Sequence, residues 1–176
     1  PEVIWENITS KNRNIIRKAK KNNIQIHHTD DYSIFEHFIS IYNQTMQRDN
    51  AEEYYYFKEE FYKAIHDYLE GNYQVFYATL DDHIIAVSII LYANKQIHYH
   101  LSGSLSEYRS FAPTNLLLYE VALWGHQQGC KTFHLGGGLG SGNDNLYKFK
   151  AAFNRNSGLQ FSIGKQIFNQ ALYNQL

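Results

Sequence analysis

Apolar residues recur at helical spacing in the first part of the chain. In residues 12–22, Ile15, Ile16 and Ala19 share one side of a predicted helix, and the other positions are mostly basic or amide residues. Residues 24–28 alternate apolar and polar positions, as in a strand with one buried face. A second helix is predicted from apolar positions three and four residues apart: Ile34, Phe35, Phe38, Ile41, Tyr42 and Met46.

The middle of the chain predicts three antiparallel strands. Residues 73–80, 83–92 and 96–102 are rich in apolar and β-branched residues. Two-residue turns, Asp81-Asp82 and Asn94-Lys95, separate them. Because turns of this length close β-hairpins, we expect the three strands to be neighbours in one sheet.

The rest of the chain alternates helices with short strands. The predicted segments are a helix at 58–69, a loop at 104–112, a helix at 113–128, a strand at 132–135, a helix at 146–153, a strand at 159–163 and a weak helix at 166–176. With the earlier elements, this order predicts an α/β (α+β) fold: a mixed sheet with helices on both faces.

Composition and charge bear on the number of domains, the cellular compartment and the presence of transmembrane helices. The 176 residues are 44% apolar, which suffices for one packed domain. The net charge is −1, yet six of the sixteen basic residues lie between Lys11 and Lys21. The single cysteine, Cys130, excludes an internal disulfide and favours a reducing compartment such as the cytoplasm. No apolar run approaches the roughly 18 residues that a transmembrane helix needs.

The segment TFHLGGGLGSGNDNLYKFKAAFN, residues 132–154, is the most suggestive chemically. Its glycine-dense loop exposes backbone amides, and the ammonium group of a nearby lysine suits a reaction that develops negative charge on oxygen. Lys148 and Lys150 point to different faces of the predicted helix. The glycine spacing fits no dinucleotide fingerprint, and Asn143 stands where a P-loop requires lysine, so a nucleotide hydrolase is not favoured.

Short motifs along the chain resemble the Fem family, GNAT-fold peptidyltransferases that add amino acids to peptidoglycan precursors. In chain order they are Lys11-x-Arg13-x-x-x-Arg17-Lys-Ala19, Tyr42-x-x-Thr45-Met-x-Arg48, Tyr99-x-x-Ser102-Gly103, Pro113-x-x-Leu116, Leu135-Gly136-Gly137 and Phe149-Lys150. Members of this family usually contain two GNAT-like domains. The resemblance, and a start at Pro1 without an initiator Met, imply that residues 1–176 are the C-terminal domain of a longer protein whose N-terminal domain is absent from this chain.

The resemblance also implies where the site lies. In the GNAT fold two parallel strands splay apart and hold the acyl donor in the gap, here residues 96–102 and 132–135. Lys150 corresponds to the lysine at the family's active site, which stabilises the oxyanion. The residues expected to bind substrate are Tyr99, Ser102, Gly103, Arg109, Asn115, Gly136, Gly137 and Arg48. A structural ion pair is the alternative for Arg48, and a solvated loop charge is the alternative for Arg109.

The implied reaction transfers an amino acid from aminoacyl-tRNA to an amine of a peptidoglycan precursor peptide, in the cytoplasm and without a cofactor. CoA-dependent GNAT enzymes have a glycine-containing pyrophosphate loop, whereas this chain has Glu107-Tyr-Arg-Ser-Phe-Ala-Pro113. The anion of a tRNA phosphate could instead bind at Arg109 and the start of the following helix. The alternatives are an N-acyltransferase using acetyl-CoA, another acyl-CoA or an acyl-carrier thioester, and a non-catalytic GNAT-fold binding module.

The nine histidines raise the question of a metal. His98 and His100 share one strand face, but two ligands without zinc-type spacing do not make a site, so no metal is expected. His134 is a minor general-base candidate, since it is expected near His100 across the splayed strands. Cys130 is better placed for packing than for attack, and no Gly-x-Ser-x-Gly motif occurs, so covalent catalysis is not supported.

Overall fold

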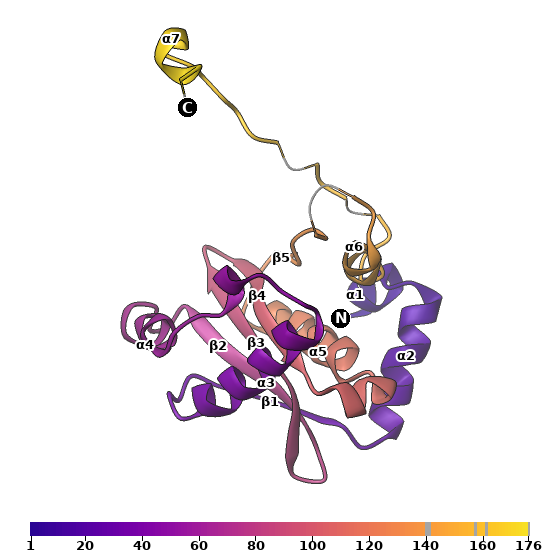
Figure 1. The fold of residues 1–176 in the computed structure, drawn as a ribbon. Coiled ribbons are helices and arrows are strands. Elements are labelled where there is room, and N and C mark those ends of the chain that lie inside the picture. Colours follow the sequence, from indigo (N-terminus) through magenta and orange to yellow (C-terminus); the bar gives the residue numbers. More distant parts are fainter. Residues whose placement is uncertain (140–141, 157, 161, 176) are drawn as a thin grey trace.

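One mixed sheet organises the chain, in the strand order β1-β2-β3-β4-β5 (Figure 1). The computed structural model describes residues 1–139, 142–156, 158–160 and 162–175. The strands are β1 (Gln25–Thr29), β2 (Tyr73–Leu80), β3 (His83–Ala93), β4 (Gln96–Ser104) and β5 (Thr132–His134). Neighbours from β1 to β4 are antiparallel, and β4 and β5 are parallel.

The two predicted hairpins are present, and their turns explain the register. Asp81 and Asp82 join β2 to β3, with φ of +49° and +63°, and Asn94 and Lys95 join β3 to β4, with φ of +51° and +62°. Two consecutive left-handed residues give the turn twist that matches the twist of paired strands. Asp and Asn tolerate this backbone conformation better than most residues.

Helices cover both faces of the sheet, as the sequence predicts. On one face, α3 (Ile34–Arg48) and α4 (Glu59–Tyr68) bury an aromatic cluster that includes Phe35, Phe38 and Tyr62. On the other face, α5 (Pro113–Gln127) packs on the strands, and α2 (Ser10–Lys21) packs against α5. The shorter helices are α1 (Glu2–Asn7), η1 (Glu53–Tyr55), η2 (Ser106–Phe111), α6 (Asn145–Ala151) and α7 (Gln170–Tyr173).

The sequence pattern did not reveal three of these short helices, one of which is η1 with only three residues. α1 has six residues, fewer than two helical turns, and Trp5 holds it to α5 through an edge-to-face contact with Tyr119 at 5.1 Å. η2 lies inside the predicted loop 104–112. α1 and η2 depend on their neighbours rather than on hydrophobic periodicity, so a pattern analysis passes over them.

The strand predicted at 159–163 is wrong for the residues that the structure describes there, and Phe161 lies outside them. Leu159 is 96% exposed and Ile163 is 80% exposed, so their apolar side chains are not buried against a sheet. The segment extends away from the sheet toward α7 (Figure 1). α7 covers only Gln170–Tyr173 of the predicted helix 166–176, whose last residue also lies outside the described part.

None of the described helices combines the length and the apolar character needed to cross a membrane.

Candidate active site

β4 and β5 part after a short parallel ladder. The ladder pairs Gln96 with Thr132, Ile97 with Phe133, and finally His98 with His134. β5 ends there, whereas β4 continues to Ser104. The expected gap between two parallel strands therefore opens at the rung formed by the two histidines.

β4 carries a bulge at the start of this gap. Ile89 of β3 pairs with Leu101 and the next residue, Ile90, pairs with Tyr99, so His100 is an extra residue in β4. A bulge leaves the backbone of the extra residue without a regular ladder partner, which makes it available to a ligand. The sequence pattern did not reveal the bulge, because the alternation of side chains continues through His100.

Lys150 extends from α6 toward both the glycine loop and β4. Its Nζ donates a hydrogen bond to the Gly137 carbonyl at 2.8 Å and lies 5.6 Å from the centre of the Tyr99 ring. Burial lowers the pKa of Lys150, and the Asp144 carboxylate partly opposes this change. Lys148 is exposed, so the two lysines differ in their surroundings.

Asp144 organises the loop that leads to Lys150. Its carboxylate accepts hydrogen bonds from the backbone amides of Leu139 and of Tyr147, the latter at 2.7 Å, and these bonds lower the pKa of Asp144. A Cβ at Gly138 would overlap the same carboxylate, so a larger residue there would displace the Asp144 side chain. Sequence reasoning missed Asp144, which directly precedes α6, because the helix was predicted to begin at residue 146 rather than at Asn145, although aspartate is a favoured N-cap residue.

The glycine loop lies close to the ammonium group of Lys150. Gly136 has a left-handed backbone with φ of +74°, and a Cβ there would lie 3.3 Å from the Lys150 Nζ. Gly137 supplies the carbonyl that accepts the Lys150 hydrogen bond, and no heavy atom would lie within 4 Å of a Cβ at this glycine. Gly136 keeps room for the lysine, and Gly137 orients it.

Three residues of β4 were predicted to bind substrate, and their surroundings differ. Burial raises the pKa of Tyr99 to about 12, so its neutral ring faces the lysine at physiological pH. Ser102 lies further along β4, paired with Ser88. Gly103 is buried, and its Cβ would lie 2.9 Å from the backbone of Ile41 and Tyr42. Close packing of α3 on β4 thus accounts for Gly103.

Arg48 joins the end of α3 to the end of β4. Its Nη1 donates a hydrogen bond to the Ser104 carbonyl at 2.7 Å, and its Nε forms an ion pair with Asp49 at 3.0 Å. The hydroxyl of Thr45, one helical turn earlier, accepts a hydrogen bond from the Ser104 amide at 2.9 Å. These contacts fit the structural alternative for Arg48 better than a ligand clamp.

Arg109 and Asn115 lie around the start of α5. Arg109 is exposed in η2. Asn115 donates a hydrogen bond from Nδ2 to Oδ1 of the buried Asn12 at 2.8 Å, so it ties α5 to α2. Among the described residues no side chain caps α5, which follows Ala112 with its left-handed φ of +57°. The first turn of α5 therefore keeps free amides that can bind an anion.

Three histidines lie where the gap opens: His98 and His134 form the last rung of the ladder, and His100 lies beside His98. The Nδ1 atoms of His98 and His134 are 2.9 Å apart, and the His98 and His100 rings are centred 5.8 Å apart. Burial lowers the pKa of His98, assisted by His134, His100 and Lys150, and burial also lowers that of His100. His134 was expected near His100, but the parallel register places it against His98.

Nothing in the described residues suggests a metal at this cluster. Over residues 1–139, 142–156, 158–160 and 162–175, no three His, Cys, Asp or Glu side chains are arranged to hold a metal ion.

The outward face of α2 is basic. Lys11, Arg17, Lys18 and Lys21 are exposed, and α2 contains no acidic residue. The Lys18 Nζ donates a hydrogen bond to the Ser110 carbonyl of η2 at 3.3 Å, so this face continues toward the start of α5.

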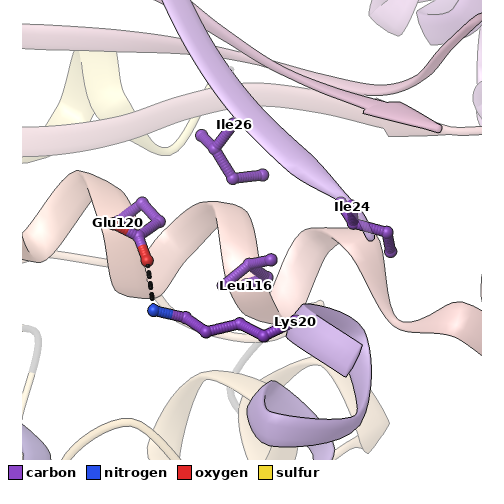
Figure 2. A pocket seen from close by; sticks show the side chains of 5 residues that line it. All are labelled: Lys20, Ile24, Ile26, Leu116 and Glu120. Atoms are coloured by element: carbon purple, nitrogen blue, oxygen red, sulfur yellow. Dashed lines mark ion pairs between the residues drawn. The ribbon is translucent and has the colours of Figure 1, made fainter. Parts of the chain in front are cut away.

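The other two basic residues of α2 have structural roles. Arg13 donates a hydrogen bond to the Ile8 carbonyl at 2.8 Å. Lys20 forms an ion pair with Glu120 at 2.8 Å beside a hollow of about 390 Å³ (Figure 2). Aliphatic side chains of Ile24, Ile26 and Leu116 line this hollow. It shares no residue with the site around Lys150.

Comparison with known proteins identifies similar sequences and structures. The family model of the acetyltransferase (GNAT) domain matches residues 10–150. No curated protein matches the sequence significantly. Among solved structures, FemX has a TM-score of 0.72 at 14% identity, over 87% of this chain and 55% of that chain.

Two further structures show the range of the similarity. Aminoglycoside N-acetyltransferase AAC(6′)-Iy in complex with CoA has a TM-score of 0.58 at 16% identity, over 81% of this chain and 94% of that chain. The C-terminal domain of a putative lysylphosphatidylglycerol synthetase from Agrobacterium fabrum has a TM-score of 0.60 at 15% identity, over 82% of this chain and 50% of that chain. The present chain thus spans about half the length of the FemX chain and of the synthetase chain, and at these identities the similarity shows the fold alone.

Proposed function

Because the chain belongs to the family of GNAT acetyltransferase domains, we propose that it transfers an amino acid from aminoacyl-tRNA to an amine of a peptidoglycan precursor peptide. The family match and the mixed sheet with one parallel pair confirm the predicted fold and the acyltransferase class. The sequence motifs that resemble the Fem family, together with the fold similarity to FemX, support the choice of donor and acceptor.

The position of Lys150 carries this proposal. Attack of an amine on an ester creates a negatively charged oxygen on the former carbonyl carbon. The ammonium group of Lys150 lies beside the open edge of β4, held between the Gly137 carbonyl and the Tyr99 ring. A preorganised cation in a partly dry site stabilises such an oxyanion more strongly than it would in water.

Two features favour tRNA over CoA as the donor. The segment 107–113, where CoA-dependent relatives bind pyrophosphate, contains no glycine and forms η2 with Arg109 exposed. The basic face of α2 (Lys11, Arg17, Lys18 and Lys21) continues toward the uncapped start of α5. A row of cations beside a helix N-terminus suits a polyanion with many phosphates.

We also propose that residues 1–176 act as the C-terminal domain of a two-domain enzyme in the cytoplasm. The chain covers 55% of FemX, which leaves room for a second domain in a protein of that size. The second domain would complete the acceptor site beside Lys150.

A transfer assay with labelled aminoacyl-tRNA and a precursor peptide tests the proposal. Lys150→Ala is expected to lower kcat/KM by about 10²- to 10³-fold, the usual effect of losing one oxyanion donor. Lys148→Ala is the matched control, because Lys148 is exposed on the same helix, and it should retain activity within about threefold. Unchanged transfer by Lys150→Ala would contradict the proposed role.

Acetyl-CoA is the donor of the second candidate function, an N-acyltransferase reaction. The fold similarity to the aminoglycoside N-acetyltransferase in complex with CoA favours this alternative. Transfer from acetyl-CoA that is abolished in Lys150→Ala, with none from aminoacyl-tRNA, would replace the first function by the second. Ligand binding without transfer from either donor would indicate a binding module.

A further inference from the structure

We propose that His98 and His134 form the proton-accepting site of the transfer reaction, an inference that rests on the acyl transfer proposed above. The two imidazoles form the last rung of the β4–β5 ladder, where the gap opens. Their Nδ1 atoms are 2.9 Å apart, and their ring planes are inclined by 21°. The parallel register therefore brings two residues 36 positions apart into direct hydrogen-bond contact.

Two imidazoles in this geometry leave one unprotonated nitrogen that can accept a proton. Two neutral imidazoles can share only one proton between facing Nδ1 atoms, so one ring donates and the other accepts. The donating ring then has an unprotonated Nε2, and the accepting ring has a protonated Nε2. Whichever tautomer is present, the pair offers one proton-accepting nitrogen and one N–H donor.

The groups around His98 disfavour its protonated form. His100 on β4 and Lys150 on α6 both disfavour a positive charge on His98, as does burial, and the aromatic ring of Phe61 on α4 lies on the His100 side, 6.3 Å from that imidazole. In the described part of the chain, no carboxylate affects the pKa of His98. The lowered pKa favours the neutral form of His98, which is the form that can accept a proton.

An acceptor amine can reach the pair. The His134 side chain is exposed, and both histidines line a hollow of about 520 Å³ beside the hairpin of β3 and β4. Leu69, Asn72 and Tyr92 form other parts of this wall. The two histidines thus line this hollow and also form the rung at which the gap begins.

The proposed step balances as follows. The nitrogen of the neutral amine forms a bond to the carbonyl carbon of the ester, and the carbonyl oxygen becomes an oxyanion stabilised by Lys150. The attacking nitrogen loses a proton to the free Nε2 of the pair. The bond from carbon to the ribose oxygen then breaks, the amide remains, and the imidazolium returns its proton to the ribose oxygen. No oxidant, reductant or cofactor is needed.

Three variants test this site in the transfer assay, over a range of pH. His98→Gln and His134→Gln are each expected to lower kcat/KM by about 10²-fold or more, within the range for general-base catalysis. The double variant should be little worse than either single variant, because the two rings act as one unit. His37→Gln, an exposed histidine of α3, is the control and should be unaffected.

The pH profile separates a base from a structural residue. In the wild-type protein kcat/KM should rise with pH as the pair loses its proton, and this rise should be absent from the two glutamine variants. Lys150→Ala should be slow but keep the rise. If both glutamine variants stay within about threefold of the wild type while Lys150→Ala loses transfer, the proton-accepting site is overturned and the proposed function stands.

An NMR titration of the imidazoles provides a readout without substrate. His98 should titrate below the ordinary histidine pKa of 6.5 in the wild type and move back toward it in His134→Gln. An unchanged His98 titration in that variant would show that the pair does not exist in solution. Failure of the proposed function is distinguishable, because it appears as absence of transfer from aminoacyl-tRNA in the wild type, and the same variants then test the base with acetyl-CoA.

Discussion

At the β4–β5 gap, the sequence predicted one functional side chain, Lys150, but not the contact between two others, His98 and His134. Lys150 was predicted from a resemblance, and its place against Tyr99 and Gly137 supports the role proposed for it. The contact between His98 and His134 was not predicted, because it depends on the register of two strands separated by α5. Local spacing defines a residue's strand face but not its neighbour across the sheet.

Burial of His98 predicts a pH dependence of folding stability. Its pKa is lowered in the folded protein, chiefly by burial, so the unfolded chain binds a proton more readily. The stabilising contribution is present above the unfolded pKa, near 6.5, and disappears as pH falls through and below that value. Urea unfolding between about pH 7.5 and about pH 5 should show this decrease.

The His98→Gln variant is the test of that assignment. Its free energy of unfolding should fall less than that of the wild type over the same pH interval, because a group that titrates differently in the two states has been removed. His37→Gln should follow the wild-type curve. Parallel curves for His98→Gln and the wild type would refute the assignment.

At the scale of elements, periodicity and turn chemistry predicted most helices and strands. α3 and α5 appear where apolar residues recur at helical spacing, and the two hairpins appear where Asp-Asp and Asn-Lys can adopt a left-handed backbone. The strand expected at 159–163 is wrong for the residues described there, because Leu159 and Ile163 are exposed and an apolar side chain that packs on nothing contributes little to strand formation. α1 and η2 are too short to produce a periodic signal.

Packing of α3 on β4 predicts the effect of a side chain at Gly103. Gly103→Ala would place a Cβ 2.9 Å from backbone atoms of Ile41 and Tyr42, which cannot rotate away. We expect a decrease of about 1–3 kcal/mol in the free energy of unfolding, the usual cost of overpacking. Gly164→Ala is the control, since its Cβ would have no heavy atom within 4 Å. Equal stabilities for the two variants, measured by urea unfolding, would contradict the packing argument.

At the scale of the whole molecule, charge is distributed unevenly. The net charge is −1, but the basic face of α2 carries four exposed cations and no carboxylate of its own. Two other cations of α2 are used for contacts within the fold, Arg13 with the Ile8 carbonyl and Lys20 with Glu120. A global charge count therefore understates what this side of the molecule can bind.

The basic face predicts salt-sensitive binding of tRNA. Replacing Lys18 and Lys21 together by glutamine should weaken binding and lower the slope of log K against log salt by about 1 for each phosphate that the variant no longer neutralises. The matched control replaces Lys63 and Lys95, also exposed, on α4 and in the β3–β4 turn. Equal salt slopes for the two double variants, measured by fluorescence anisotropy, would exclude the basic face as the surface that binds tRNA.

The sequence alone determined the type and order of most elements and a mixed sheet, because hydrophobic periodicity and turn residues act over a few neighbouring positions. It also singled out Lys150 through its motif. The tertiary structure decided the bulge at His100, the close approach of α3 to Gly103 and the pairing of His98 with His134. These features arise from contacts between segments far apart in the chain, where packing and strand register, rather than local preference, set the geometry.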